Sequence, residues 1–448
     1  MIKRKIDRYL QEQYAGDTKA LLITGARQIG KTFSIREYGK TYKRFVEINF
    51  ADNPEYIHIF NQAKGSKEIL ERLSIITEKP LIKGETLIFF DEVQLCPEIV
   101  TAVKYLVDEG SYRYILSGSL LGVELKDLRS EPVGYMSVKE MYPLDFEEFI
   151  VSQGVSDTVI DTLKTAWETR TEVDDFIHGK MMDLFRLYLV VGGMPAAVKC
   201  YNTTHDLQKV LQEQQSILHL YKRDIAQYDP ARKLNINEIF DLIPPELNAA
   251  NKRFILKRLN KNAKFERYSD SFLWLKNAGV ALPIYNVEEP KIPLLLARSR
   301  NLFKLFQSDV GLLAAQYAEG IQLRILSGVK DINYGSIYEN AVAQELVAHG
   351  LSPYYFNSKK QGELDFVIEL GGNIVPIEVK SGKDYTQHRA LANIMINPDY
   401  SLPEAFIFCN DNVKRKDKFI YAPIYMVMFL ERKNDAPRYY KIDLSGLS

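Results

Sequence analysis

The pattern of hydrophobic positions changes after residue 154 of this chain. In the first 154 residues, short and fully apolar runs are separated by segments whose apolar residues recur at helical spacing. Continuous apolar runs predict strands buried on both faces, and their alternation with helices predicts a parallel sheet. The clearest of these runs cover residues 20–23 and 86–90, and residues 44–50 and 112–116 are expected as two further strands. We therefore predict an α/β core over residues 1–154.

The rest of the chain predicts three further units. Residues 155–235 are rich in helix formers and show little strand pattern, so we expect a helical lid. Residues 236–318 carry three helical patterns and then two strands around a proline-rich stretch, an order that resembles a winged helix. Residues 319–448 form the last unit. The winged-helix-like segment has its helices at 237–242, 252–259 and 269–277, and its strands at 281–287 and 302–307.

Composition narrows the class of protein. Lys and Arg number 58 and so do Asp and Glu, so no overall field attracts nucleic acid. The three cysteines lie far apart and indicate neither a disulfide framework nor a zinc site. We find no apolar run of ~18 residues and no secretory signal after the basic start. These features predict a cytoplasmic protein without a membrane partner.

The segment that follows the first apolar run carries the strongest chemical pattern. Gly25-Ala26-Arg27-Gln28-Ile29-Gly30-Lys31-Thr32 fits the phosphate-loop pattern at every fixed position, between an expected strand and an expected helix. Glycines let backbone N–H groups approach a phosphate, and the helix N-terminus adds positive potential. Lys31 is expected to reach the β- and γ-phosphates, and Thr32 to hold Mg²⁺. We therefore predict a P-loop NTPase that binds ATP with Mg²⁺.

Polar residues also follow the third and fourth expected strands, at residues 86–90 and 112–116. Asp91 and Glu92 end the third run, and charges there belong at the ligand edge of an open α/β sheet. Asp91 is expected to support Mg²⁺ and Glu92 to polarise the attacking water. The alternative is a strand end with two solvated acids, which the phosphate loop upstream disfavours. Ser117 and Ser119 follow the fourth run, either near the γ-phosphate or in an ordinary Ser-Gly turn.

Several motifs in order resemble those of AAA-type ATPases of bacteria and archaea. They are GARQIGKT, LIFFDEVQ, YILSGSLL and YPLDFEEF, followed by GGMPAAV, YKRDI and SDVGLL. Members of this family join an ATPase core to a C-terminal domain of unknown function similar to restriction endonucleases. The resemblance implies ATP hydrolysis, and a homo-oligomer is possible because AAA-type cores often hydrolyse ATP at subunit contacts. Many relatives have Ala-Gly-Arg where this chain has Val133-Gly134-Tyr135, so the arginine finger stays unassigned, with Arg129 as one candidate.

A hairpin near the C-terminus carries a second chemical pattern. Two strand-like runs flank Gly371-Gly372-Asn373, and counting back from this turn places Asp365 opposite residues 378–380. Glu378 and Lys380 share a face because they are two residues apart in one strand. This trio resembles the PD-(D/E)XK nuclease site, in which two carboxylates bind Mg²⁺ and the lysine acts on the attacking hydroxide.

Two further residues fit the nuclease pattern. Glu339 lies on an expected helix before the hairpin, where it is either a site carboxylate or the end of a capping box that starts at Ser336. Gln387 lies on the next expected helix and is either a site residue or a solvated glutamine. The alternative to a working nuclease is a restriction-endonuclease-like domain that has lost its metal and only holds DNA.

One segment is basic although the whole chain carries no net charge, and this local charge favours nucleic-acid binding. Residues 251–300 contain eleven Lys or Arg against four Asp or Glu, an excess of seven positive charges. Arg267, Lys276 and Arg298 could flank a groove for phosphates. The alternative is a solvated face or a surface that docks within the molecule. Three functions follow: an ATP-dependent enzyme acting on DNA or other nucleic acid, a nucleotide-gated switch that cuts nothing, and a remodeller of proteins.

Overall fold

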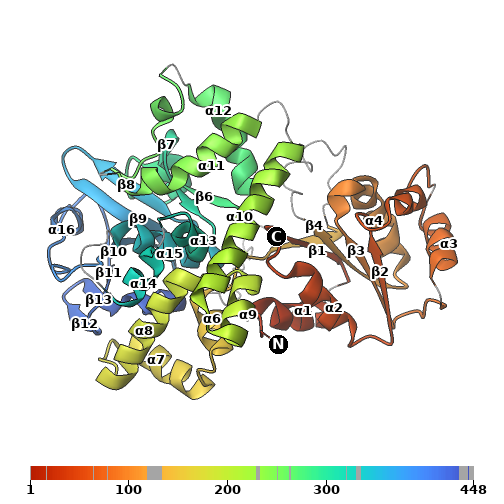
Figure 1. Ribbon diagram of the computed structural model, residues 1–448, viewed down its shortest axis with the longest axis horizontal. Coiled ribbons are helices and arrows are strands. Elements are labelled where there is room, and N and C mark those ends of the chain that lie inside the picture. The colour runs from red at the N-terminus through yellow and green to blue at the C-terminus, as the bar shows by residue number, and fades with distance from the viewer. Residues whose placement is uncertain are drawn as a thin grey trace.

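The computed structural model describes residues 2–16, 18–63, 65–77, 79–118, 134–228, 233–249, 251–261, 264–318, 320–328, 334–432 and 442. The candidates Ser119 and Arg129 lie outside these residues. Within the described residues the chain forms two sheets with a layer of helices between them (Figure 1).

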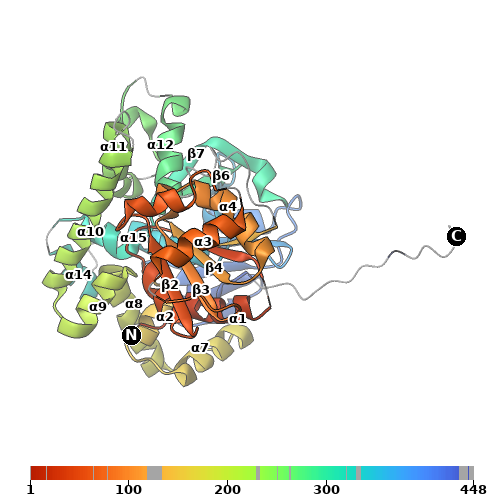
Figure 2. The ribbon, with the colours of Figure 1, turned by 90° about the vertical axis from the view of Figure 1, so that its right-hand side faces the viewer.

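The first sheet confirms the predicted α/β core. It consists of parallel strands in the order β2-β3-β4-β1-β5. The strands are β1 (Ala20–Thr24), β2 (Arg44–Asn49), β3 (Thr86–Asp91), β4 (Arg113–Gly118) and β5 (Met136–Glu140). The helices of this unit are α1 (Lys5–Gly16), α2 (Lys31–Gly39), α3 (Ser66–Ile76) and α4 (Glu98–Glu109). Figure 2 views this unit from the side that α3 covers.

Alternation along the strands explains this arrangement. Leu21 and Ile23 of β1 enter one hydrophobic core, which also contains residues of α1 and α2. Leu22 enters a second core with residues of α3 and α4. Both faces of the sheet are therefore covered, as is usual for a parallel sheet. Gly110 ends α4 in the left-handed conformation, with φ 74°.

Helices fill the middle of the chain, and several of them lie between the two sheets (Figure 1). They are α6 (Phe146–Ser152), α7 (Asp157–Thr169), α8 (Asp175–Val191), α9 (Pro195–Thr204), α10 (Leu207–Tyr228), α11 (Lys233–Leu247) and α12 (Phe265–Asn277). The helix predicted over residues 252–259 is wrong, because only a 3₁₀ turn forms there, at Leu256–Arg258.

The second sheet has eight strands in the order β12-β13-β11-β10-β9-β8-β6-β7. The strands are β6 (Ala281–Val287), β7 (Arg298–Gln307), β8 (Tyr354–Ser358), β9 (Gly362–Leu370), β10 (Asn373–Val379), β11 (Ala405–Cys409), β12 (Lys414–Lys416) and β13 (Phe419–Pro423). Its helices are α13 (Val310–Ala315), α14 (Ile321–Leu326), α15 (Tyr334–Ala348) and α16 (Arg389–Met395).

The two strands expected in the wing belong to this second sheet. β6 pairs with β7 and, in parallel, with β8 of the C-terminal unit. The sequence does not predict this, because β6 and β8 are joined only by tertiary pairing. The expected boundary between residues 318 and 319 therefore lies between strands that belong to the same sheet.

A single hydrophobic core runs through most of the molecule. It extends from Ile6 to Leu430 and includes residues of both sheets and of the helices between them. None of the helices in the described part of the chain is both long and apolar enough to cross a lipid bilayer.

Candidate functional site

The predicted phosphate loop connects β1 to α2 in a conformation that needs glycine. Gly25 and Gly30 have φ of 134° and 95°. At Gly25 a Cβ atom would also collide with the carbonyl oxygen of Met141. No described side chain caps the N-terminus of α2, so its first amide groups face the loop. Together these features form a cradle for an anion.

Lys31 lies buried inside this cradle. Its Nζ donates to the carbonyl oxygens of Gly25 and Ala26 at 2.8 and 2.7 Å. Burial lowers the pKa of Lys31 to about 8, and the charges of Glu92 and Asp91 oppose this shift. A buried amine held only by carbonyl groups is stabilised by the arrival of a phosphate, because the phosphate supplies the missing negative charge.

Asp91 gathers the polar residues at the edge of the sheet. Its carboxylate accepts hydrogen bonds from Thr32 at 3.0 Å, from Asn49 at 3.4 Å, and from Ser117. Burial raises the pKa of Asp91, while the hydrogen bonds from Ser117 and Thr32 work in the opposite direction. Thr32, Asp91 and Ser117 therefore meet as the sequence predicts. Asn49, at the end of the neighbouring strand β2, was missed.

Glu92 adopts a backbone conformation that is uncommon for its type. Its φ of 57° and ψ of 43° place it in the left-handed region, directly after β3. Its carboxylate accepts a hydrogen bond from Gln94. Such outliers occur where the surrounding structure holds a side chain in a required direction.

These residues fit a nucleoside triphosphate with Mg²⁺. The glycine-dependent cradle and the buried Lys31 suit the phosphates, and the hydroxyl of Thr32 beside the Asp91 carboxylate suits a hard cation. Bound Mg²⁺ would neutralise charge that develops on the phosphates.

Parts of the chain far from the loop also contact it. Arg27 forms an ion pair of 2.6 Å with Asp224 on α10, and the Tyr221 hydroxyl donates to the Arg27 carbonyl oxygen at 3.2 Å. A Cβ atom at Gly279 would lie 2.9 Å from the amide nitrogen of Ala26. Tyr221 and Asp224 belong to the YKRDI motif, whose residues have no role that the sequence alone predicts.

The C-terminal trio converges as predicted from the hairpin. Asp365 accepts the Val379 amide N–H at 2.8 Å, and Lys380 forms an ion pair of 2.7 Å with Glu378. Burial raises the pKa of Asp365 well above its usual range, and the charges of Glu339 and Glu378 act in the same direction. Burial also raises the pKa of Glu378, against the effect of Lys380.

Glu339 joins this cluster through lysines that the sequence did not indicate. Its carboxylate forms ion pairs with Lys252 and, at 3.5 Å, with the fully buried Lys304, which also pairs with Glu363 at 2.8 Å. Burial alone would raise the pKa of Glu339, but the two lysines outweigh it and lower that pKa. The capping-box alternative is wrong, because α15 begins at Tyr334 and Ser336 bonds Asn248 instead.

This cluster does not fit a metal ion. Lysines already pair with Glu339 and Glu378, and burial raises the pKa of Asp365. Across the part of the chain that the structure describes, no group of three or more His, Cys, Asp or Glu residues is placed to hold a metal. Gln387 is exposed and lies before α16 rather than on it. The geometry does not support the metal role expected of Asp365 and Glu378.

The basic segment is largely exposed. Some of its charges are already paired: Arg258 with Glu246 and Lys291 with Glu289, each at 3.0 Å. Arg298 lies over the ring of Tyr285, 4.5 Å from its centroid. The exposed basic residues on and near α12 are Lys257, Lys261, Lys264, Arg267 and Lys276.

The fold and the site define a P-loop ATPase core, and comparison with known families agrees. Residues 17–150 match a family described as an AAA domain. Residues 182–323 and 334–427 match two domains of unknown function, DUF8612 and DUF4143. The restriction-endonuclease likeness therefore stays a prediction. Comparison with curated proteins gives no match.

Solved structures give distant similarities. The Walker-type ATPase PABY2304 of Pyrococcus abyssi is 15% identical with a TM-score of 0.41, covering 70% of this chain and 96% of that one. The ORC2 protein of Aeropyrum pernix, in ADPNP–ADP complexes, is 13% identical with a TM-score of 0.36, covering 73% and 93%. AMPPCP-bound DnaA from Aquifex aeolicus is 10% identical with a TM-score of 0.27, covering 62% and 88%. These similarities are too low to indicate function.

Proposed function

We propose that this chain is a Mg²⁺-dependent ATPase whose nucleotide state controls its binding to nucleic acid. The observation that carries the proposal is the convergence of Lys31, Thr32, Asp91 and Ser117 around a glycine-dependent loop. Lys31 binds the β- and γ-phosphates, and Thr32 and Asp91 hold Mg²⁺. Glu92 orients the attacking water, so that catalysis comes from positioning and charge stabilisation.

Contacts between the loop and α10 support coupling to the rest of the chain. Because Arg27 pairs with Asp224, a phosphate that attracts Arg27 also changes the forces on α10. Through α11, which contacts both α10 and α12, this change reaches the basic segment. The exposed lysines there contact phosphates of DNA without reading sequence.

DNA binding is tested by its dependence on salt. We expect affinity for duplex DNA to fall as salt rises, and the double variant Lys261→Gln/Lys264→Gln to weaken binding and flatten that dependence. Lys164→Gln, an exposed lysine on α7, is the matched control and should leave both unchanged. Equal effects of the two changes, or a salt-independent affinity, would reject this surface.

We also propose that the C-terminal cluster binds but does not cut. The ion pairs of Lys252, Lys304 and Lys380 support this, since they occupy the carboxylates that a metal needs. Purified protein incubated with plasmid and Mg²⁺ or Mn²⁺, with and without ATP, should leave the plasmid intact. Cleavage that disappears in Lys380→Ala would restore the nuclease function and end this part of the proposal.

A homo-oligomer is part of the proposal. The arginine finger is unassigned in this chain, and a second copy could supply one to the γ-phosphate. We expect ATP turnover per chain to rise with protein concentration, in parallel with assembly seen by light scattering. Concentration-independent turnover by a monomer would contradict this.

A further inference from the structure

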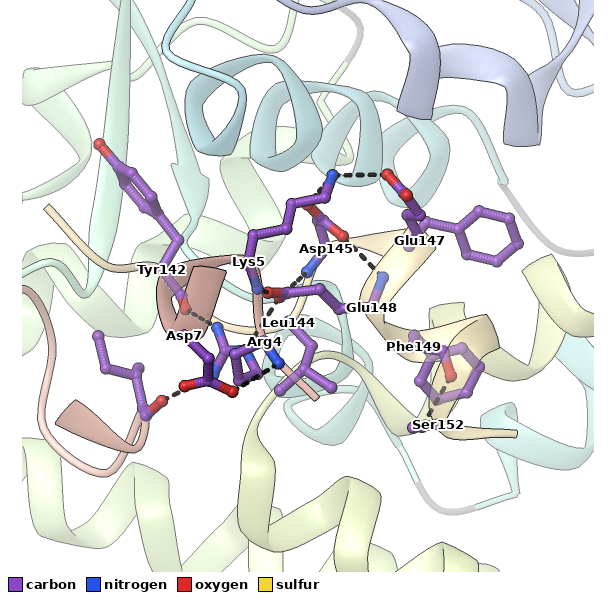
Figure 3. A network of polar contacts seen from close by, with 12 residues as sticks. Arg4, Lys5, Asp7, Tyr142, Leu144, Asp145, Glu147, Glu148, Phe149 and Ser152 are labelled. Carbon is purple, nitrogen blue, oxygen red and sulfur yellow. Dashed lines mark hydrogen bonds and ion pairs between the residues drawn. The ribbon is translucent and has the colours of Figure 1, made fainter. Parts of the chain in front are cut away.

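Arg4 contacts the phosphate loop from a segment outside the AAA match. Its guanidinium donates to the carbonyl oxygen of Ile29 at 3.0 Å and to that of Tyr142 at 2.8 Å. Its Nε forms an ion pair of 3.0 Å with Glu148, and both side chains are only 8% exposed. Figure 3 shows Arg4 lying between Tyr142 and Glu148.

The fixed carbonyl group sets the direction of an amide group in the loop. In a trans peptide the C=O of one residue and the N–H of the next point to opposite sides of one plane. Because Arg4 holds the Ile29 carbonyl, the Gly30 N–H is directed away from Arg4. Gly30 is the second fixed glycine of the phosphate loop and has φ 95°. Because glycine has no Cβ atom, its backbone is less restricted than that of other residues, so a hold from a neighbouring group matters more there.

The support behind Arg4 is itself rigid. Glu148 also accepts the Lys5 amide N–H at 2.5 Å, and it closes a capping box with Asp145 at the start of α6. Lys5 pairs with Asp145 at 2.8 Å. Arg4 is therefore held by an ordered helix start. A planar guanidinium suits this position because one group reaches two carbonyls and a carboxylate at fixed angles.

We propose that Arg4 is a positioning residue that preorganises the Gly30 amide for the phosphates of a bound nucleotide. The inference rests on the proposed nucleotide function. Arg4 does not touch the nucleotide, and it acts through the peptide between Ile29 and Gly30. Tyr221 holds the peptide after Arg27 in the same way, through the Arg27 carbonyl.

The test is ADP binding by calorimetry in Arg4→Lys. This variant keeps the positive charge beside Glu148 but loses the planar guanidinium that reaches both carbonyl groups. We expect the Kd for ADP to rise at least tenfold, while the Kd for adenosine, which has no phosphate, stays unchanged. Arg8→Lys on α1, the helix that Arg4 precedes, is the control, because Arg8 is exposed and pairs only with Glu12 among the described contacts.

A second variant covers the case in which Arg4→Lys fails to fold in thermal unfolding. Glu148→Gln keeps Arg4 and removes its ionic partner, so it should weaken ADP binding less than Arg4→Lys and again spare adenosine. Unchanged ADP affinity in either folded variant, or equal losses for ADP and adenosine, would overturn the role of Arg4. Failure of the unaltered protein to bind ADP would instead reject the proposed nucleotide function.

Discussion

Glu92 combines a strained backbone with a place at the sheet edge beside the phosphate loop. Its left-handed φ of 57° is held although glutamate gains nothing from that conformation. Together with the hydrogen bond from Gln94, this conformation orients the carboxylate. We propose that this carboxylate orients the attacking water.

The change Glu92→Gln tests this role. We expect ATP hydrolysis to fall by about 100-fold or more, because the amide cannot act as a base, while ATP binding persists. Single-turnover hydrolysis and equilibrium binding would be measured on the same preparation. Hydrolysis that survives the change removes Glu92 as the water-orienting group.

Lys31 provides a test by pH. Because burial lowers its pKa to about 8, the nucleotide-free protein loses the Lys31 charge as pH rises through that value. We expect ATP affinity to be constant near pH 7 and to fall above pH 8, approaching about tenfold per pH unit. The Lys31→Arg variant stays charged, so its affinity should lack this decline. A flat profile for the unaltered protein would contradict the assignment.

At the scale of elements, α10 contacts the phosphate loop through two side chains. Its Tyr221 and Asp224 hold the backbone and the side chain of Arg27, and they lie one turn apart on one face of the helix. The loop is therefore held to α10 at Arg27.

The change Asp224→Asn should weaken the contact between α10 and Arg27. We expect the KM for ATP to rise several-fold, because Arg27 loses its ionic partner and the loop loses order. Asp241→Asn is a matched control, since Asp241 on α11 pairs with Lys222 of α10 at 2.7 Å and has no described contact with the loop. Steady-state kinetics that change equally in both variants would argue against a specific effect of the Asp224–Arg27 ion pair.

Local elements follow from the sequence, and long-range pairings do not. The loop, Asp91 and Glu92 are set by contiguous residues, and the turn fixes the hairpin register, with Ile377 opposite Phe366. The pairing of β6 with β8 depends on residues about seventy positions apart. The same holds for Lys304 beside Glu339 and for Arg4 beneath the phosphate loop.

At the scale of the whole molecule, buried polar residues join the ATPase core to the C-terminal unit. The Phe146 amide donates to Glu345 on α15 at 2.8 Å, and Tyr188 donates to the same carboxylate at 3.0 Å. His349 lies 3.4 Å from Asp145 and 3.6 Å from Glu345. With the continuous core, these contacts make the units one body.

This junction predicts how stability depends on pH. Burial raises the pKa of Glu345 to about 7, despite the nearby His349. Burial alone would lower the pKa of His349, but Asp145 and Glu345 raise it. Both groups bind more protons when folded, so their contribution is full at low pH. That of Glu345 is lost as pH rises through about 7, and that of His349 above its unfolded value near 6.5.

Thermal unfolding of the unaltered chain and of Glu345→Gln checks this prediction between pH 4.5 and 7.5. The difference in unfolding temperature should become less favourable to the unaltered chain as pH rises, because only that chain loses a proton at residue 345. A difference that is constant over this range, or that grows with pH, would contradict the assignment.

The central claim is that a nucleoside triphosphate with its magnesium binds in the loop from Gly25 to Thr32. Calorimetric titration of the full chain with ATP and Mg²⁺, beside Lys31→Ala, tests it most directly. The account predicts one saturable site per chain, with binding abolished or weakened at least a hundredfold in the variant. No heat of binding in the unaltered protein, or equal affinity in the two, would contradict it.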